Sequence, residues 1–383
     1  MAELSKLILV LWIVFLLSAD TLTGQVTQKA RPPDDANNIP NVELELLMKE
    51  RDKHGDDFLE LNREIVAKAF LLGEIDIADE AVDEILKIQP QDMDALTSKG
   101  QIHELRGEYW FAQACYQRVL YAAEDANSPS WQAAAFSNLG NVHYIQGDLD
   151  NAEGMHKKSL EINNRIGFEE GLAISYANLG FVYCQKGDLN LAEKMHNKAL
   201  ELNMKIERQE GIANCYGNLG LLFQMQGELA KAEEMHKKAL ELNTKLGQLP
   251  GMVNSYGNLG NLYYRRGDLN KAAQMYRKVL EIEEKLGRPA SIANSLGNLG
   301  VIYMDIDDLD KAEVLHNNAL KIDLQLKNKE AIARHYSNLG TICSKRGDFD
   351  KAKEYWQRAQ ELYEEMDMKG QSRQVQLWLE KNN

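Results

Sequence analysis

The chain has 383 residues, 27% of them charged, with a formal net charge of −14 and a pI near 5.2. This acidic balance argues against nucleic-acid binding, which requires a basic surface facing the phosphates. Acidic character also favours solubility, which is the more general explanation of the charge.

Residues 1–25 differ from everything that follows. Lys6 precedes an unbroken apolar run from Leu7 to Leu17, and small or polar residues come directly after it. A run of about eleven to thirteen apolar residues suits an export signal and is short for a membrane span. The small residues that cleavage prefers are poorly placed. Three interpretations therefore stay open: a cleaved signal, an uncleaved membrane anchor through residues 7–19, or a cytosolic protein with an unusual N-terminus.

Residues 26–41 have the proline and polar content of a linker, with Pro32, Pro33 and Pro40. A helical pattern resumes near Val42, and we expect residues 42–58 to form an N-terminal capping helix. Residues 59–372 then read as a repeat array, and residues 373–383 as a C-terminal capping helix that covers its exposed end.

The array is organised by the tripeptide Asn-Leu-Gly, which returns every forty residues. It begins at Asn138, Asn178, Asn218, Asn258, Asn298 and Asn338. A second glycine follows seven residues after the first in every unit but one, where Asp307 stands instead. Two earlier units keep the frame without the tripeptide, which makes eight repeats. A fixed period in this range is typical of a stacked-repeat protein.

Each unit predicts two helices. In the unit from Ala173 to Asn203, Tyr176, Leu179 and Tyr183 fall on one helical face. Gly187 then suits a left-handed residue past a helix end, and Asp188 can cap the next helix. Small residues stand where the two helices would cross, at Gly180 and Ala192. Because each pair is apolar on both sides, it is stable only when stacked on its neighbours.

These residues resemble the tetratricopeptide repeat family. The family's pattern of aromatic, Leu-Gly, aromatic, Ala, aromatic and Ala is matched by Tyr176, Leu179, Gly180, Tyr183, Ala192, His196 and Ala199. The forty-residue unit is similar to those of kinesin light chain, the Leu-Gly-Asn-repeat spindle proteins and many bacterial repeat proteins. The resemblance implies an all-α fold, a right-handed superhelical solenoid of about eight antiparallel helix pairs, with the first helix of each pair lining a concave groove.

The six repeated asparagines are the leading candidate site. A carboxamide both donates and accepts, so a row of them can pair with the main chain of an extended peptide. The resemblance implies this role, since the matching asparagines of the relatives are understood to act in this way. The alternative is structural, with each asparagine tying its helix to the next repeat, and both roles can hold together.

Specificity would come from residues three and six positions after each asparagine, on the same face. Those we single out as peptide-binding are Tyr144, Phe181, Leu221, Asn261 and Tyr264. The middle of this set is apolar and its flanks are more polar, which suits a partly hydrophobic, extended peptide.

Other chemistry has little support. His156, His196, His236 and His316 share one repeat position with Tyr116, Tyr276 and Trp356, which indicates a packing slot for a flat ring. Successive rings would lie about 10 Å apart, too far for one metal ion. The pairs Glu153–Lys157 and Glu233–Lys237 read as surface support. The four cysteines form no zinc or redox motif, and a bridge between Cys184 and Cys215 is weakly supported. We find no enzyme motif.

We therefore expect a non-catalytic scaffold, without cofactor or metal, whose groove binds a peptide or partner protein. It would be exported to a periplasm or secreted, or tethered to a membrane. Two alternatives stay open: a regulatory sensor whose superhelix changes pitch on binding ligand, and an assembly factor that self-associates.

Overall fold

The computed structural model describes residues 44–49 and 58–381. The predicted signal, the linker and residues 42, 43 and 50–57 of the predicted N-terminal cap lie outside this range. Within it, residues 44–49 are helical, and Leu44 is buried against Ile65 and Val66 of the first repeat. No strand occurs in residues 44–49 or 58–381, so the described fold is all-α as predicted.

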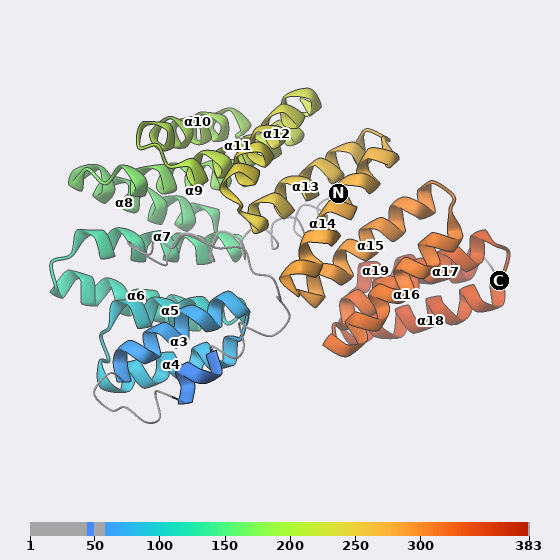
Figure 1. The fold of residues 1–383 in the computed structure, drawn as a ribbon, viewed down its shortest axis with the longest axis horizontal. Helices are drawn as coiled ribbons and strands as arrows, with labels where there is room; N and C mark the ends of the chain where they lie inside the picture. The colour runs from blue at the N-terminus through green and yellow to red at the C-terminus, as the bar shows by residue number, and fades with distance from the viewer. Residues whose placement is uncertain (1–43, 50–57, 382–383) are drawn as a thin grey trace. The chain divides into compact units, whose positions relative to one another are not determined.

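The helices form successive antiparallel pairs (Figure 1). They belong to two compact units, which divide between Arg208 and Gln209. The first unit contains α3 (Phe58–Leu72) with α4 (Ile75–Ile88), α5 (Met93–Leu105) with α6 (Tyr109–Asp125), α7 (Pro129–Ile145) with α8 (Leu149–Ile166), and α9 (Glu169–Lys186) with α10 (Leu189–Lys205). The second contains α11 (Gln209–Gln226) with α12 (Leu229–Leu246), α13 (Leu249–Arg265) with α14 (Leu269–Leu286), α15 (Pro289–Asp305) with α16 (Leu309–Leu326), and α17 (Lys329–Lys345) with α18 (Phe349–Glu365). The final helix α19 (Lys369–Lys381) packs against α18, where Trp378 and Trp356 have ring centroids 5.8 Å apart.

The turn inside each pair follows from its glycine and aspartate. Gly187 adopts a left-handed conformation at φ +82°, which glycine reaches at little cost. Asp188 then caps α10 by accepting a hydrogen bond from the Leu191 amide at 3.0 Å. Asp307 takes the same left-handed conformation at φ +68°, although it has a side chain. The predicted turn is therefore confirmed, including at the unit that lacks its glycine.

The tripeptide glycine lies where the two helices of a pair cross, directly against a buried ring. A Cβ built on Gly140 would lie 2.6 Å from Cε1 of His156, whose side chain is 1% exposed. The same contact recurs in six other pairs: Gly100 with Tyr116, Gly180 with His196, Gly220 with His236, Gly260 with Tyr276, Gly300 with His316 and Gly340 with Trp356. The histidine position is thus a packing slot, as predicted. In the first repeat, Val66 stands at the glycine position and Val82 at the ring position. Two side chains of medium size there replace a glycine and a large ring.

First helices of successive repeats also contact one another, in α5/α7 and α7/α9 of the first unit and in α11/α13 and α15/α17 of the second. The odd-numbered helices therefore line one side of each unit, which we call the first-helix face. The even-numbered helices line the opposite side, the second-helix face. Since every Asn-Leu-Gly lies in an odd-numbered helix, the candidate site belongs to the first-helix face.

Candidate peptide-binding face

The six asparagines are not equally accessible. Asn138, Asn178 and Asn218 are buried, with exposed fractions of 4%, 9% and 3%. Asn258 and Asn338 are half-buried, and Asn298 is exposed. Identical tripeptides therefore present carboxamides to solvent only from α13 onward.

One of the buried asparagines joins two successive repeats. Asn178 donates a hydrogen bond from Nδ2 to Oγ of Ser137 at 3.2 Å. Ser137 lies on α7, so this bond ties two successive first helices together. Oδ1 of Asn218 is buried without a hydrogen-bond partner among the described residues. The Ser137 bond favours the structural role for Asn178, one of the two roles that the sequence left open, while Asn138 and Asn218 are buried.

The accessible asparagines of the second unit lie beside small residues and a second amide row. An ideal Cβ on Gly257, next to Asn258, would meet nothing within 4 Å, so the backbone of α13 is open to a ligand. Asn254 and Asn294 stand one helical turn before Asn258 and Asn298, and both are half-buried. Our sequence reasoning missed this second row. Its signal was an asparagine four residues before the tripeptide in three successive repeats: Asn214, Asn254 and Asn294.

A cation lies at the end of this second row. Arg334 occupies the corresponding position of α17 and donates from Nη2 to Oδ1 of Asn294 at 3.2 Å. The bond links α15 and α17 on the same face as the accessible amides. The Asn294 carboxamide therefore accepts a hydrogen bond from the next repeat.

The predicted specificity residues are divided between the two units. In the first unit, burial raises the pKa of Tyr144, and the edge of the Phe181 ring packs against His196 at 5.2 Å. In the second unit, Leu221 is half-buried and Asn261 accepts a hydrogen bond from the Tyr276 hydroxyl.

Tyr264 is the most accessible of the five, with an exposed fraction of 38%. Its hydroxyl donates to Oδ2 of Asp305, in the next first helix, at 2.6 Å. This hydrogen bond to a carboxylate, together with burial, raises the pKa of Tyr264 to about 12. Tyr264 is therefore neutral at ordinary pH.

Ion pairs across repeats are more extensive than helical spacing indicated. Glu153 pairs with Lys157 at 2.6 Å, as predicted, but also accepts from the Tyr183 hydroxyl at 2.9 Å and contacts Lys186 in the next repeat. Hydrogen bonds from Lys157 and Lys186 lower the pKa of Glu153 to about 2. Glu233 repeats the arrangement with Lys237, Tyr263 and Arg266. These glutamates stabilise repeat stacking as well as their own helices.

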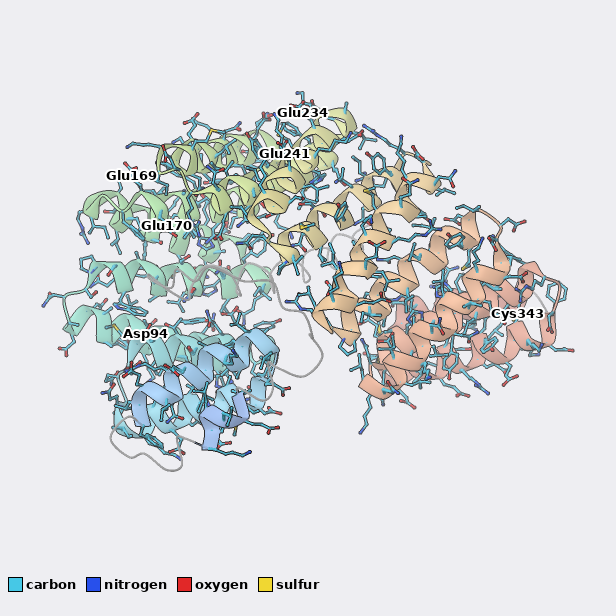
Figure 2. All side chains as sticks on the ribbon, viewed as in Figure 1. Asp94, Glu169, Glu170, Glu234, Glu241 and Cys343 are labelled. Carbon is cyan, nitrogen blue, oxygen red and sulfur yellow. The ribbon has the colours of Figure 1, made fainter. Side chains whose placement is uncertain are left out.

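Other carboxylates pair only along one helix. Figure 2 shows Glu234 and Glu241 on α12, which form ion pairs with Lys238 and Lys245 one turn later, each at 2.7 Å. Exposed pairs of this kind contribute little to stability.

A buried polar network connects α16 and α17. Nε2 of His335 lies 3.0 Å from Oδ2 of Asp323, and its Nδ1 lies 3.2 Å from Nδ1 of His316. All three residues are at most 2% exposed. Burial lowers the pKa of His335 to about 3 and that of His316 to about 4, so both rings are neutral at pH 7. The network holds two repeats together.

A repeated polar residue in the sequence was a signal of this network, which our sequence analysis did not recognise. The position of Asp323 is polar in each preceding forty-residue unit, on an otherwise apolar face: Asn163, Asn203, Asn243 and Glu283. Each of these side chains is buried. Nδ2 of Asn163 lies 3.3 Å from Oγ of Ser175, and Nδ2 of Asn243 lies 3.4 Å from Oγ of Ser255. The position is a repeated link between a second helix and the following first helix.

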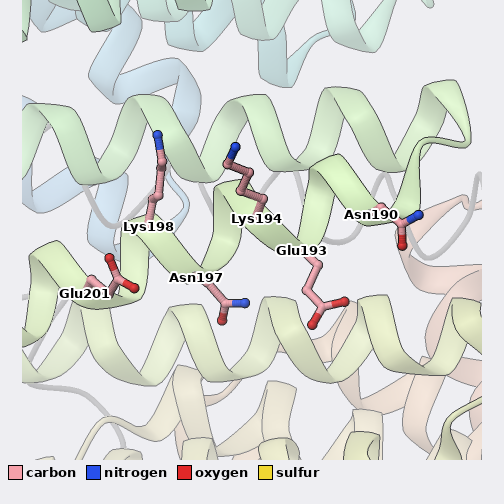
Figure 3. Close-up of a pocket in the computed structure, with 6 residues that line it drawn as sticks. All are labelled: Asn190, Glu193, Lys194, Asn197, Lys198 and Glu201. Atoms are coloured by element: carbon pink, nitrogen blue, oxygen red, sulfur yellow. The ribbon is translucent and has the colours of Figure 1, made fainter.

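A shallow hollow on α10 is lined by one helix alone, as Figure 3 shows. Its six residues are polar or charged: Asn190, Glu193, Lys194, Asn197, Lys198 and Glu201. Lys198 lies over the Tyr176 ring, 4.8 Å from its centroid, which is an internal contact of the repeat. We assign no site to this hollow.

Three further observations concern the described residues only. They contain no cluster of three or more histidine, cysteine or acidic side chains arranged to hold a metal ion. Cys115, Cys184, Cys215 and Cys343 are free thiols, so the weakly supported bridge is not formed. None of the helices between residues 44 and 381 that the structure describes combines the length and apolarity of a membrane span.

Comparison with solved structures finds many similar folds. A signal-transduction ATPase with a tetratricopeptide repeat sensor, from Pyrococcus horikoshii, is 17% identical with a TM-score of 0.62, covering 90% of this chain and 55% of that one. The apo form of the quorum sensor NprR from B. thuringiensis is 15% identical with a TM-score of 0.58, covering 85% and 93%. A Rap protein complexed with competence and sporulation factor is 16% identical with a TM-score of 0.52, covering 81% and 100%. At these identities the likeness concerns the fold.

Comparison with family models identifies the repeats themselves. The model described as a MalT-like TPR region matches residues 212–383. The model described as a tetratricopeptide repeat matches residues 91–165, 131–205 and 171–245. A search of curated proteins finds no sequence match. The two models together span residues 91–383, and the chain belongs to the tetratricopeptide repeat proteins.

Proposed function

We propose that this chain is a non-catalytic scaffold that binds an extended peptide, or an extended segment of a partner protein, on the first-helix face of its second unit. The observation that carries the proposal is the change in accessibility along the asparagine row. Asn258, Asn298 and Asn338 keep their carboxamides available, whereas Asn138, Asn178 and Asn218 are buried.

The chemistry of this face suits a main chain better than a particular side chain. Carboxamides donate to peptide carbonyls and accept from peptide amides, so a row of them binds successive peptide groups. Gly257, beside Asn258, leaves room for a close approach. Leu221 and Val301 on the same face would contact apolar side chains of the ligand. The tetratricopeptide repeat sensor of the P. horikoshii ATPase, the quorum sensor NprR and the Rap protein complexed with competence and sporulation factor are consistent with this use of the face.

The test is a selection of displayed random linear peptides on the full chain, followed by measurement of Kd. One variant carries Asn258→Ala, Asn298→Ala and Asn338→Ala. The matched control carries the same change at three exposed asparagines of the second-helix face: Asn270, Asn317 and Asn318. We expect the first variant to lose at least about tenfold in affinity, because each lost hydrogen bond contributes about 1 kcal/mol. The control should bind as the parent does. Equal binding by both variants would remove the proposal.

A regulatory sensor is the second candidate, favoured by the sensor proteins among the structural neighbours. In this case, a selected peptide would change the dimensions of the array as well as bind to it. Small-angle scattering with and without that peptide separates the two functions. An unchanged scattering curve at saturating peptide would exclude the sensor function and favour the scaffold function.

We also propose that the protein is exported or tethered to a membrane. The apolar run from Leu7 to Leu17 supports export or membrane tethering. Fractionation of expressing cells, with mass determination of the mature N-terminus, tests it. A protein found entirely in the cytosol with an intact N-terminus would contradict export.

A further inference from the structure

The second-helix face of the first unit carries an aromatic stripe on α6. Trp110 is 77% exposed, Phe111 57% and Tyr121 63%. Trp110 and Tyr121 are eleven residues apart, which is three helical turns, so they lie on the same side of α6 about 16 Å apart. Ala114, between them, is also exposed. Large aromatic side chains contribute most of the binding energy in many protein interfaces and are otherwise rarely left in water.

The other repeats show what these positions normally carry. The six forty-residue units place polar or small residues where Trp110 stands: Asp150, Asn190, Ala230, Asn270, Asp310 and Asp350. Where Tyr121 stands they have only charged residues: Glu161, Glu201, Glu241, Glu281, Lys321 and Glu361. Where Phe111 stands, four of the six have lysine: Lys231, Lys271, Lys311 and Lys351. Since the repeat fold is satisfied by charged side chains at these positions, the aromatic residues of α6 are not required for folding.

The surroundings of the stripe are strongly acidic. Residues 74–128 carry twelve acidic and four basic side chains, a net charge of −8 out of −14 for the whole chain. Arg118 of α6 donates to the Pro90 carbonyl, just beyond the end of α4, at 2.6 Å, so this part of α6 lies beside the C-terminal end of the acidic helix α4. Asp76 on α4 has a side chain that is 97% exposed, and it contacts Arg106. An apolar stripe inside a negative field attracts a ligand that is both apolar and basic.

We propose that this stripe is a second docking surface, separate from the asparagine face, for a basic amphipathic helix of a partner protein. Its apolar side covers Trp110, Phe111 and Tyr121 over about three turns. Its lysine or arginine side chains face the acidic residues of α4 and the C-terminal end of α6, where Glu124 and Asp125 are exposed. Arginine also stacks on an exposed indole through a cation–π contact, which favours Trp110 as the central anchor.

The chain supplies the variant that tests this proposal. Trp110→Asp, Phe111→Lys and Tyr121→Glu place on α6 the residues that sibling repeats carry at the same positions. The full chain, this variant and the Asn258/Asn298/Asn338→Ala variant are each used to select and bind displayed random peptides. We expect a class of peptides rich in arginine or lysine, with apolar residues at helical spacing. It should lose at least about tenfold in affinity for the α6 variant, weaken with added salt and bind the asparagine variant unchanged.

Each other outcome overturns the proposal. Selected peptides that bind parent and α6 variant equally would show that the stripe is not a docking surface. Selected peptides that need the stripe for binding but contain no excess of lysine or arginine would refute the proposed basic character of the partner. Dimerisation of the parent but not the variant in sedimentation would assign the stripe to a second copy. Variant-sensitive binding to vesicles of phosphatidylcholine and phosphatidylserine would assign it to a membrane. Trp110→Ala alone repeats the measurement with minimal change of charge, and matching thermal unfolding establishes that each variant is folded.

Discussion

The contact between the tripeptide glycine and the buried ring predicts two opposite effects of one substitution within a single repeat. Gly140→Ala on α7 adds a Cβ that would lie 2.6 Å from Cε1 and 2.8 Å from both nitrogens of His156. Carbon atoms in contact normally lie about 3.5–4.0 Å apart, so the ring or the helix must move by about 1 Å. Gly154→Ala on α8 adds the same atom where nothing lies within 4 Å.

The magnitudes follow from two competing terms. Alanine is favoured over glycine inside a helix by about 1 kcal/mol, and both sites gain this. At Gly140, overpacking against the His156 ring, which is 1% exposed, costs about 1–3 kcal/mol or more. We therefore expect Gly154→Ala to raise the free energy of unfolding by about 0.5–1 kcal/mol and Gly140→Ala to lower it by about 1–2 kcal/mol.

Guanidinium unfolding followed by circular dichroism measures both variants against the parent. Equal effects of the two substitutions would refute the crossing argument. A second arm uses the first repeat, where Val66 and Val82 occupy these positions. The double variant Gly140→Ala with His156→Val should be more stable than the sum of its single changes predicts, because the smaller side chain makes room for the new methyl group.

Three further predictions concern buried polar groups and caps. His196 is buried with neither ring nitrogen hydrogen-bonded within the described part of the chain, and burial lowers its pKa to about 4. Its folded pKa is below the ordinary 6.5, so stability is present above pH 6.5 and is lost as pH falls toward 4, by about 1.4 kcal/mol per pH unit. His196→Phe should stabilise the protein and reduce this slope in unfolding at pH 7 and pH 5; an unchanged slope would exclude His196 as its source. Glu228 is the N-cap residue of α12 and makes no side-chain cap, whereas aspartate caps its helix at the same position of other repeats, as Asp188 does. Glu228→Asp should therefore raise the unfolding midpoint by the equivalent of about 0.5–1 kcal/mol, and a fall would contradict the capping argument. Asn178→Ala should destabilise by about 1 kcal/mol through loss of the Ser137 bond, while the exposed Asn298→Ala should leave thermal unfolding unchanged. Equal effects at both asparagines would contradict the division between buried and accessible carboxamides.

The sequence alone was sufficient for the repeat architecture, because each determinant is local and recurs. Gly187 and Asp188 specify a turn and a cap from adjacent residues, and the forty-residue period repeats that instruction. The pairing of Gly180 with His196 was also predictable. Both residues lie within one helix pair, and the ring position accepts histidine, tyrosine and tryptophan alike, which indicates packing from the sequence alone.

Only the tertiary structure decided which of these features face solvent. Asn138 and Asn298 begin two copies of the same tripeptide, yet Asn138 is only 4% exposed whereas Asn298 is exposed. The difference arises because the surroundings of each depend on the side chains of its neighbouring repeats. Glu153 looked like half of a helical ion pair, but Lys186, thirty-three residues later, is a second partner. Trp110 is a large aromatic residue of the kind that usually packs in a core, but it is 77% exposed to solvent. A periodic sequence fixes which residues share a helix face, whereas burial depends on which side chains the adjacent repeat places against that face.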